Sequence, residues 1–335
     1  MRLPRPRGPF SERVFAELTR PDPRPVPYDV PSADVVSDED TQVALWALYE
    51  LAHRGFDGVD PDHEWSPALL TTRAEVEAVL DEAIAGLTTP AVDRVAGDPA
   101  HVAAQLLALI DDADDPGLAR YLQREATDEQ YREFLVHRSV YHLKESDPHA
   151  WAVPRIDGAA KVALAELLYD EFGAGRPDRL HSTLFARALE GAGLDPAYGA
   201  YVDVVPAPTL AVSNAMSRFG LHRARRGAIL GHLAAFEATS SLPCRRYSAG
   251  AGRLGFDARV TDYFDEHVEA DAVHEQLAIR SICQRLVEQD PTLHRDVLVG
   301  AATCLQLDAL AGRQMLDAWE QGLSSLLDEP QQEVA

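Results

Sequence analysis

Apolar residues recur along most of this chain at the spacing of three and four residues that marks one face of an α-helix. Alternating runs of β-branched residues, which would indicate strands, are nearly absent; a short run at residues 202–205 ends directly at Pro206. Proline and glycine separate many of the helical segments. The pattern therefore predicts an all-α fold, a bundle of helices with short connections. The predicted helices cover residues 40–53, 72–86, 99–111, 128–145, 158–172, 179–191, 209–219, 225–239, 257–288 and 291–327.

The composition changes along the chain and predicts four regions. Residues 1–35 hold many of the prolines and are predicted to form an extended N-terminal arm. Residues 36–95 are predicted to be a helical N-terminal extension, residues 96–328 a helical bundle domain, and residues 329–335 a frayed tail. The seam between extension and bundle is expected at residues 90–99, which have a proline at each end. Thr127 and Gln130 have the spacing of a capping box, which places a helix start at Asp128.

The chain carries 31 Lys and Arg against 54 Asp and Glu, a formal charge of −23. This excess argues against nucleic acid or an anionic membrane surface as the main partner, because both attract basic patches. No apolar run approaches the roughly 20 residues that cross a bilayer, and the first residues lack the apolar stretch of a signal peptide. Three widely spaced cysteines form neither a disulfide framework nor a metal motif, so each is expected to be a buried apolar residue of a cytoplasmic protein.

The most informative segment is a predicted helix that contains His267, Asp271 and His274. These residues stand at i, i+4 and i+7 and therefore lie along one stripe of the helix. Two imidazoles and a carboxylate on one face offer nitrogen and oxygen ligands, a mixture that suits iron or manganese better than calcium. The alternative is an exposed polar stripe, which is common in a chain as acidic as this one.

A second segment runs from Glu171 to His181. Glu171 continues the apolar stripe of Leu164 and Leu168, and a carboxylate on such a face is costly unless it is paired or bound to a metal. Gly173, Gly175 and Pro177 interrupt the helix, and a break there turns His181 back toward Glu171 in this interpretation. The alternative is an ordinary helix–loop–helix whose polar residues only cap its helices.

Two single acids complete the candidate set. Glu145 lies on a stripe with Phe134 and Tyr141, so it can face inward at the end of its helix. Glu237 stands in an otherwise apolar helical run. Each could instead be an acid on a helix face that is open to water. Acids and histidines that point inward from several separate helices are typical of di-iron bundles.

One motif is set aside. Gly250-x-Gly252-x-x-Gly255 has the spacing of a dinucleotide-binding loop, but no apolar strand precedes it. The segment is predicted to be a flexible loop before the His267 helix.

Four stretches together resemble the heme-oxygenase-like di-iron oxidases, which are also described as iron-containing redox enzymes. They are Leu143-Lys-Glu145-Ser-Asp-Pro-His, the segment from Glu171 to Asp178-Arg-Leu-His181, Phe236-Glu237-Ala-Thr-Ser, and the His267-x3-Asp271-x2-His274 helix. Their order and spacing within residues 100–290 also resemble the family, whereas residues 1–95 carry no family motif. The resemblance implies that residues 96–328 form a bundle similar to that of a heme oxygenase, with the helical extension preceding it.

The resemblance also implies a metal site. By match to the family's pattern, the catalytic iron ligands are Glu145, Glu171, His181, His267, Asp271 and His274. Glu237 matches an extra carboxylate that some members use as a seventh ligand, whereas Asp178 matches no ligand position. The implied cofactor is a pair of Fe(II) ions, with O2 as co-substrate and without heme.

An O2-dependent non-heme di-iron oxidoreductase of small-molecule, biosynthetic metabolism follows from this resemblance. The family's reactions include N-oxygenation and oxidative C–C or C–H cleavage of amino-acid-like or fatty-acid-like substrates, and the sequence does not choose among them. The alternative is a non-catalytic metal- or small-molecule-binding protein on the same scaffold, because a fold does not fix a function. The expected partners are a small-molecule substrate and a second copy in a homodimer, the commonest oligomer; an external reductant is left open.

Overall fold

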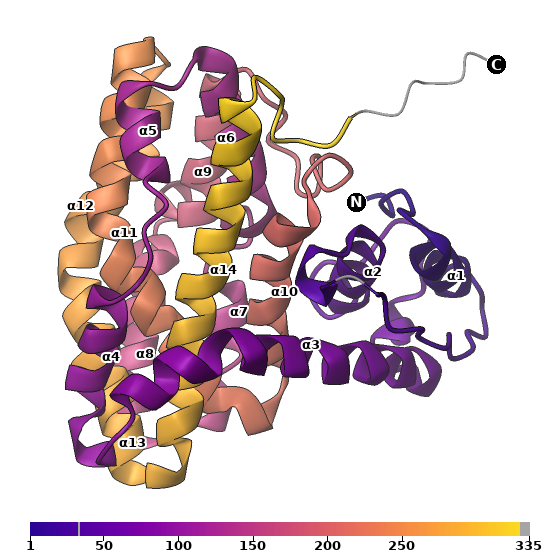
Figure 1. Ribbon diagram of the computed structural model, residues 1–335, viewed down its shortest axis with the longest axis horizontal. Coiled ribbons are helices and arrows are strands. Elements are labelled where there is room, and N and C mark those ends of the chain that lie inside the picture. Colours follow the sequence, from indigo (N-terminus) through magenta and orange to yellow (C-terminus); the bar gives the residue numbers. More distant parts are fainter. Residues whose placement is uncertain (33, 329–335) are drawn as a thin grey trace.

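The computed structural model describes residues 1–32 and 34–328, without the side chains of residues 269–273. This part of the chain is mostly helical and contains no strand, which confirms the all-α prediction (Figure 1). A helical π segment, Leu277–Gln284, joins two of the helices. The α-helices are α1 Pro9–Leu18, α2 Glu39–Glu50, α3 Pro67–Val95, α4 Val102–Asp111, α5 Leu118–Arg124, α6 Asp128–His142, α7 Asp147–Ala150, α8 Gly158–Glu171, α9 His181–Gly191, α10 Ala207–Leu221, α11 Arg226–Leu254, α12 Ala258–Gln276, α13 Arg285–Gln289 and α14 His294–Glu320.

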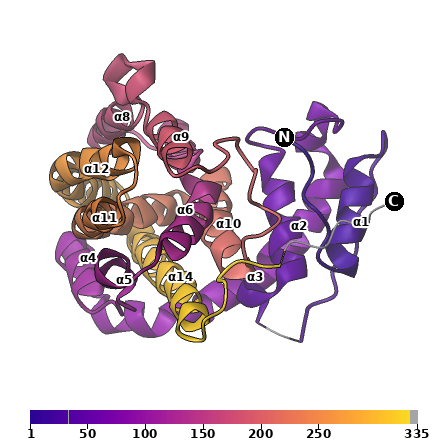
Figure 2. The same cartoon turned by 90° about the horizontal axis from the view of Figure 1, so that it is seen from above.

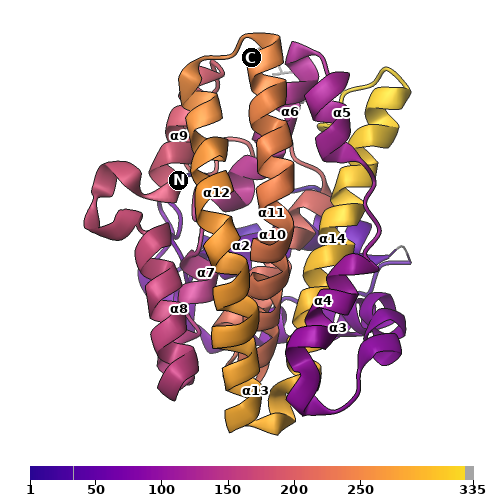
Figure 3. The same ribbon diagram turned by 90° about the vertical axis from the view of Figure 1, so that its left-hand side faces the viewer.

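The bundle is built around α6 and α11. Seen from above, α6 lies among α9, α10, α11 and α14 (Figure 2). From the side, α11 runs along α12 and α14, and α8 stands on the other side of α12 (Figure 3). The predicted capping box opens α6: Gln130 N donates to Thr127 Oγ1 at 3.3 Å, and Thr127 N donates to Gln130 Oε1 at 2.9 Å. Helices from distant parts of the chain therefore enclose the interior of the bundle.

The N-terminal residues lie beside the bundle and contact it. Helix α2 stands next to α10 and α1 packs on the far side of α2, and the long α3 crosses from α2 to α14 (Figure 1). One cluster of buried apolar side chains extends from Phe10 in α1 to Leu307 in α14. The boundaries predicted at residues 35, 95 and 328 stay predictions, and the tail at 329–335 lies outside the described residues.

Several local predictions were wrong. Residues 1–35 were predicted to be extended, but α1 forms within them because Phe10, Val14 and Leu18 give a proline-free stretch a buried apolar face. Pro90 lies inside α3, which continues to Val95 within the expected seam at residues 90–99, and the place of the seam stays a prediction. The glycine motif at residues 250–255 is not a loop, because α11 continues to Leu254.

Two other features bear on the predictions from composition. The cysteines Cys244, Cys283 and Cys304 are free and buried, as predicted. Among the described residues, no helix combines the length and the apolar character that a membrane crossing requires.

Candidate metal centre

Buried carboxylates and imidazoles gather in two adjacent clusters inside the bundle. Cluster 1 consists of Glu145, His181 and His267, and cluster 2 consists of Glu171, Glu237 and His274. Within each cluster, one ligand atom of every residue lies within 4.8 Å of the others, and all the side chains are buried. The contributing elements are the turn after α6 and the helices α8, α9, α11 and α12. The structure therefore brings together every predicted ligand whose side chain it describes; the side chain of Asp271 lies outside the described residues.

Glu145 lies in the turn that follows α6, three residues beyond the end of the helix. His142 Nδ1 lies 2.8 Å from Glu145 Oε1, and the Tyr263 hydroxyl donates to Glu145 Oε2 at 2.8 Å. The next residue, Ser146, has a left-handed φ of 66° and donates from Oγ to Glu171 Oε2 at 2.8 Å. This turn thus places the Glu145 carboxylate in cluster 1 and, through Ser146, donates a hydrogen bond to Glu171 of cluster 2.

His142, Tyr263 and Ser146 were missed by the sequence analysis, although they orient the predicted ligands. Their signal is spacing: His142 precedes Glu145 by three residues, and Tyr263 precedes His267 by four. Hydrogen-bond partners of this kind hold metal ligands in place in many proteins.

The predicted break between α8 and α9 brings Glu171 and His181 together. Gly173 has a left-handed φ of 79°, and a Cβ there would lie 2.7 Å from the backbone nitrogen of Leu180, so this tight turn requires glycine. The chain reverses, and His181 begins α9 with its Nδ1 3.2 Å from Glu171 Oε2. Asp178, which matched no ligand position, is exposed.

Helix α12 sends one imidazole to each cluster. His267 Nδ1 donates to the Tyr263 carbonyl at 2.8 Å, so in the neutral ring Nε2 carries the lone pair; it lies 3.6 Å from Glu145 Oε1. About two helical turns further on, His274 Nδ1 lies 3.5 Å from Glu171 Oε1 and 3.4 Å from Glu237 Oε2. Glu171 therefore contacts an imidazole of each cluster.

The electrostatics of both clusters favour a cation. Burial would raise the pKa of Glu145, but His142 and His267 outweigh it and hold this pKa well below its usual range. Burial is likewise outweighed by His181, which lowers the pKa of Glu171. Burial lowers the pKa of His274, but Glu237 and Glu171 outweigh it and raise this pKa to about 9. Without a metal, a proton on His274 supplies part of the positive charge that the buried carboxylates require.

These residues fit iron. Neutral imidazole and carboxylate are the ligand types that iron accepts in non-heme sites, and the carboxylates offset much of the charge of two divalent ions. Cysteine takes no part in either cluster, so the donor set is not one that selects zinc or an iron–sulfur cluster through thiolates.

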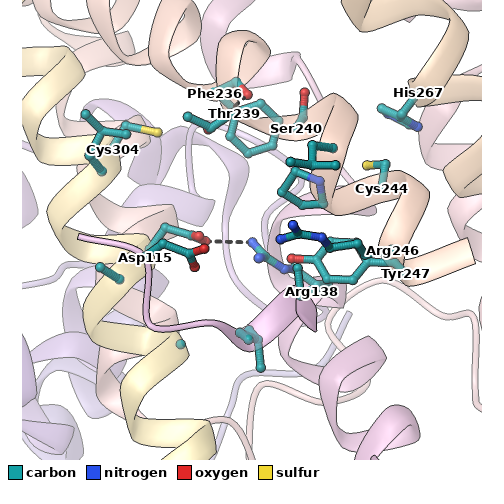
Figure 4. Close-up of a pocket in the computed structure, with 18 of the residues that line it drawn as sticks. Asp115, Arg138, Phe236, Thr239, Ser240, Cys244, Arg246, Tyr247, His267 and Cys304 are labelled. Carbon is teal, nitrogen blue, oxygen red and sulfur yellow. Dashed lines mark hydrogen bonds and ion pairs between the residues drawn. The ribbon is translucent and has the colours of Figure 1, made fainter. Parts of the chain in front are cut away.

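A cavity of ≈ 410 Å³ adjoins cluster 1 and is lined by α6, α11, α12 and α14 (Figure 4). Glu145 and His267 of cluster 1 belong to its lining. Away from His267, Arg138, Arg246 and Tyr247 lie near one another together with Asp115 (Figure 4). The wall between is largely apolar, with Phe134, Phe236, Phe264, Leu305 and Ala309.

The basic end of this cavity has a definite place relative to the cluster. Arg138 and Glu145 are seven residues apart on α6 and the turn that follows it, so they lie roughly 10 Å apart along the axis if the helical rise is extended to Glu145. Arg138 Nη1 donates to Asp308 Oδ1 at 2.8 Å. Arg246 is half-buried, and no acidic side chain of the described residues forms an ion pair with it. Asp114, Asp115 and Asp308 also line the cavity, so Arg246 is the guanidinium at this end that is available to an anionic group.

Comparisons with known proteins agree with this chemistry. The family model described as "Iron-containing redox enzyme" matches residues 132–309, more than half of the chain, and this range contains both clusters. A nitrosourea synthase from Streptomyces achromogenes subsp. streptozoticus is 30% identical over 157 residues, which are 47% of this chain and 33% of the relative. The match thus spans about a third of the length of that relative.

Proposed function

The chain belongs to the family of iron-containing redox enzymes, and we propose that it is a non-heme di-iron oxidase or oxygenase that uses O2 to oxidise a small metabolite. The observation that carries this proposal is the position of Glu171, which contacts His181 of cluster 1 and His274 of cluster 2. A carboxylate between two groups of ligands is what a pair of metal ions requires.

In this proposal, cluster 1 and cluster 2 each hold one Fe(II) ion, and Asp271 joins them as the resemblance implies. When bound, iron supplies an open position for O2 and the electrons for its reduction. The protein's own residues orient the metal ligands and exclude water. Tyr263 and His142 hold Glu145 in one orientation, and the apolar cavity wall excludes water from the bound substrate.

The cavity supports a substrate with an apolar body and an anionic end, as in an amino-acid-like or fatty-acid-like molecule. Arg246 would bind the carboxylate, and the carbon chain would lie along the aromatic wall toward Glu145 and His267. Among the family's reactions, the name of the matched nitrosourea synthase favours N-oxygenation, because a nitroso group carries oxygen on nitrogen. C–C or C–H cleavage remains the second reaction class, and an external reductant is a proposed partner.

Anaerobic loading of the full chain with Fe(II) tests this function. We expect about two iron ions per chain, and O2 consumption when linear amino acids or fatty acids are added. His267→Ala should lose about one iron and most of the turnover, because it removes a ligand of cluster 1. His232→Ala is the matched control, since His232 is equally buried but belongs to neither cluster, and it should keep both ions.

Two results would contradict the proposal in different ways. If the His267→Ala protein retained all its iron and full turnover, cluster 1 would not be the metal site. If the unmodified protein bound iron but consumed no O2 with any of these substrates, it would be a non-catalytic metal-binding protein on the same scaffold.

A further inference from the structure

The end of α2 contacts the residue that precedes Glu145. The Lys144 ammonium forms an ion pair with the carboxylate of Glu50, the last residue of α2, and both side chains are almost completely buried, at 1% and 0% exposure. The Tyr198 hydroxyl donates to the other carboxylate oxygen, Glu50 Oε2, at 2.8 Å. A charge from the N-terminal extension is therefore fixed beside the turn that carries Glu145.

A second contact holds the same turn one residue earlier. Arg54 Nη2 donates to the carbonyl oxygen of Leu143 at 2.9 Å, and the Arg54 guanidinium lies over the Tyr198 ring, 4.1 Å from its centroid. Leu143 and Lys144 are thus both bound by side chains from residues 50–54. On the far side of Glu145, Ser146 has the left-handed φ of 66°. A residue other than glycine keeps such a conformation only where its surroundings determine it.

Stability alone does not account for the buried pair. Removing two charges from water offsets most of their attraction, and apolar replacements of both partners are often neutral or stabilising. A buried pair does fix the orientation of its two side chains, because the charges have few other arrangements available in the interior. Here the pair fixes the orientation of Lys144, the residue next to the predicted iron ligand Glu145.

We propose that Glu50 and Arg54 are positioning residues for Glu145: the N-terminal extension fixes the turn at residues 143–146 so that the Glu145 carboxylate faces His181 and His267. This inference rests on the proposed function for the assignment of Glu145 as a ligand. It assigns a role to the extension, which carries no family motif and lies outside the matched residues 132–309.

The double variant Glu50→Leu/Lys144→Met of the full chain tests the proposal, because it removes both charges and leaves neither one buried alone. We expect the metal-free variant to unfold at a temperature only slightly below that of the unmodified protein, because the Tyr198 hydroxyl loses its acceptor Glu50 Oε2. Its Kd for Fe(II) should rise by about 10- to 100-fold, the usual cost of losing a contact that orients a ligand. Amide hydrogen exchange at residues 143–146 of the metal-free protein should become faster. Arg54→Met, which alters an exposed side chain, should likewise raise the Kd for Fe(II) and make amide exchange at residues 143–146 faster.

The matched control is Asp81→Leu/Arg218→Met. Arg218 Nη2 and Asp81 Oδ2, 2.8 Å apart, also join the extension to the bundle, through α3 and α10, but neither residue belongs to either cluster. Iron affinity and exchange at residues 143–146 should remain unchanged in this control.

The outcomes separate this inference from the proposed function. Unchanged iron affinity and unchanged exchange in Glu50→Leu/Lys144→Met would overturn the inference, as would equal losses in both double variants, which would make the extension a source of stability only. If the unmodified protein bound no iron while exchange at residues 143–146 still rose only in Glu50→Leu/Lys144→Met, the proposed function would fail and the positioning of the turn would stand.

Discussion

Glu145 illustrates how far single residues were predictable. Its place on an apolar stripe predicted an inward carboxylate, and the structure buries it. Its donor Tyr263 comes from a helix 118 residues further along the chain, and only the fold brings the two together. The ligand set as a whole stays a prediction, although its described members face one another. Stripes on single helices can identify inward acids, whereas the partners of these acids depend on contacts between helices.

At the cavity, Arg246 and its neighbour Arg245 provide a sharp test of substrate binding. Arg246→Gln removes a guanidinium that lines the cavity, so the KM for a carboxylate substrate should rise by about 10-fold or more while kcat changes little. Arg245→Gln makes the same change of charge at an exposed side chain that does not line the cavity, and it should leave KM unchanged. Steady-state kinetics on both variants would decide, and equal effects on KM would indicate long-range electrostatics instead of a direct contact.

At the scale of helices, the periodic pattern predicted most elements and misplaced several of their ends. The helix predicted at residues 225–239 continues as α11 to Leu254, through Pro243. Leu242-Pro243 was interpreted as a stop, because proline removes a backbone donor from a helix. In the structure α11 packs against α12 and α14. This packing outweighs the preference of proline against a helix interior, which is the information that the local sequence provides.

The close approach of α11 and α14 predicts a strong effect of one methyl group. A Cβ on Gly300 of α14 would lie 1.8 Å from the Ala228 carbonyl oxygen of α11. Gly300→Ala should therefore lower the free energy of unfolding by about 1–3 kcal/mol, because backbone has to move. Gly252→Ala is the control: nothing lies within 4 Å of its Cβ, so the better helix propensity of alanine should raise stability by about 0.5–1 kcal/mol. Urea unfolding of both variants measures the difference, and a neutral Gly300→Ala would mean that the helices separate easily.

The molecule as a whole should lose stability in mild acid. Burial lowers the pKa of His137 to about 3 and that of His232 to about 4, from an ordinary value of 6.5. The unfolded chain therefore takes up protons on these rings below pH 6.5 while the folded chain does not, so stability falls as pH falls. Each ring should contribute about 1 kcal/mol of loss between about pH 7 and about pH 5.5.

Urea unfolding of the metal-free protein at these two pH values measures this loss. His137→Gln should reduce it by about 1 kcal/mol, since glutamine does not titrate. The same pH dependence in the variant and the unmodified protein would show that His137 takes up its proton equally in the folded and unfolded chains, so that burial does not lower its pKa.

The ion pair between Lys144 and Glu50 has a consequence for chimaeras that combine segments of related proteins. Residues 132–309 contain the predicted ligands and Lys144, but not Glu50. A chimaera that joined this segment to foreign N-terminal helices would bury the Lys144 ammonium without its carboxylate, at a cost of about 3–5 kcal/mol. We expect positions 50 and 144 to change in concert during divergence, so that a lineage that lost one charge would also have lost the other.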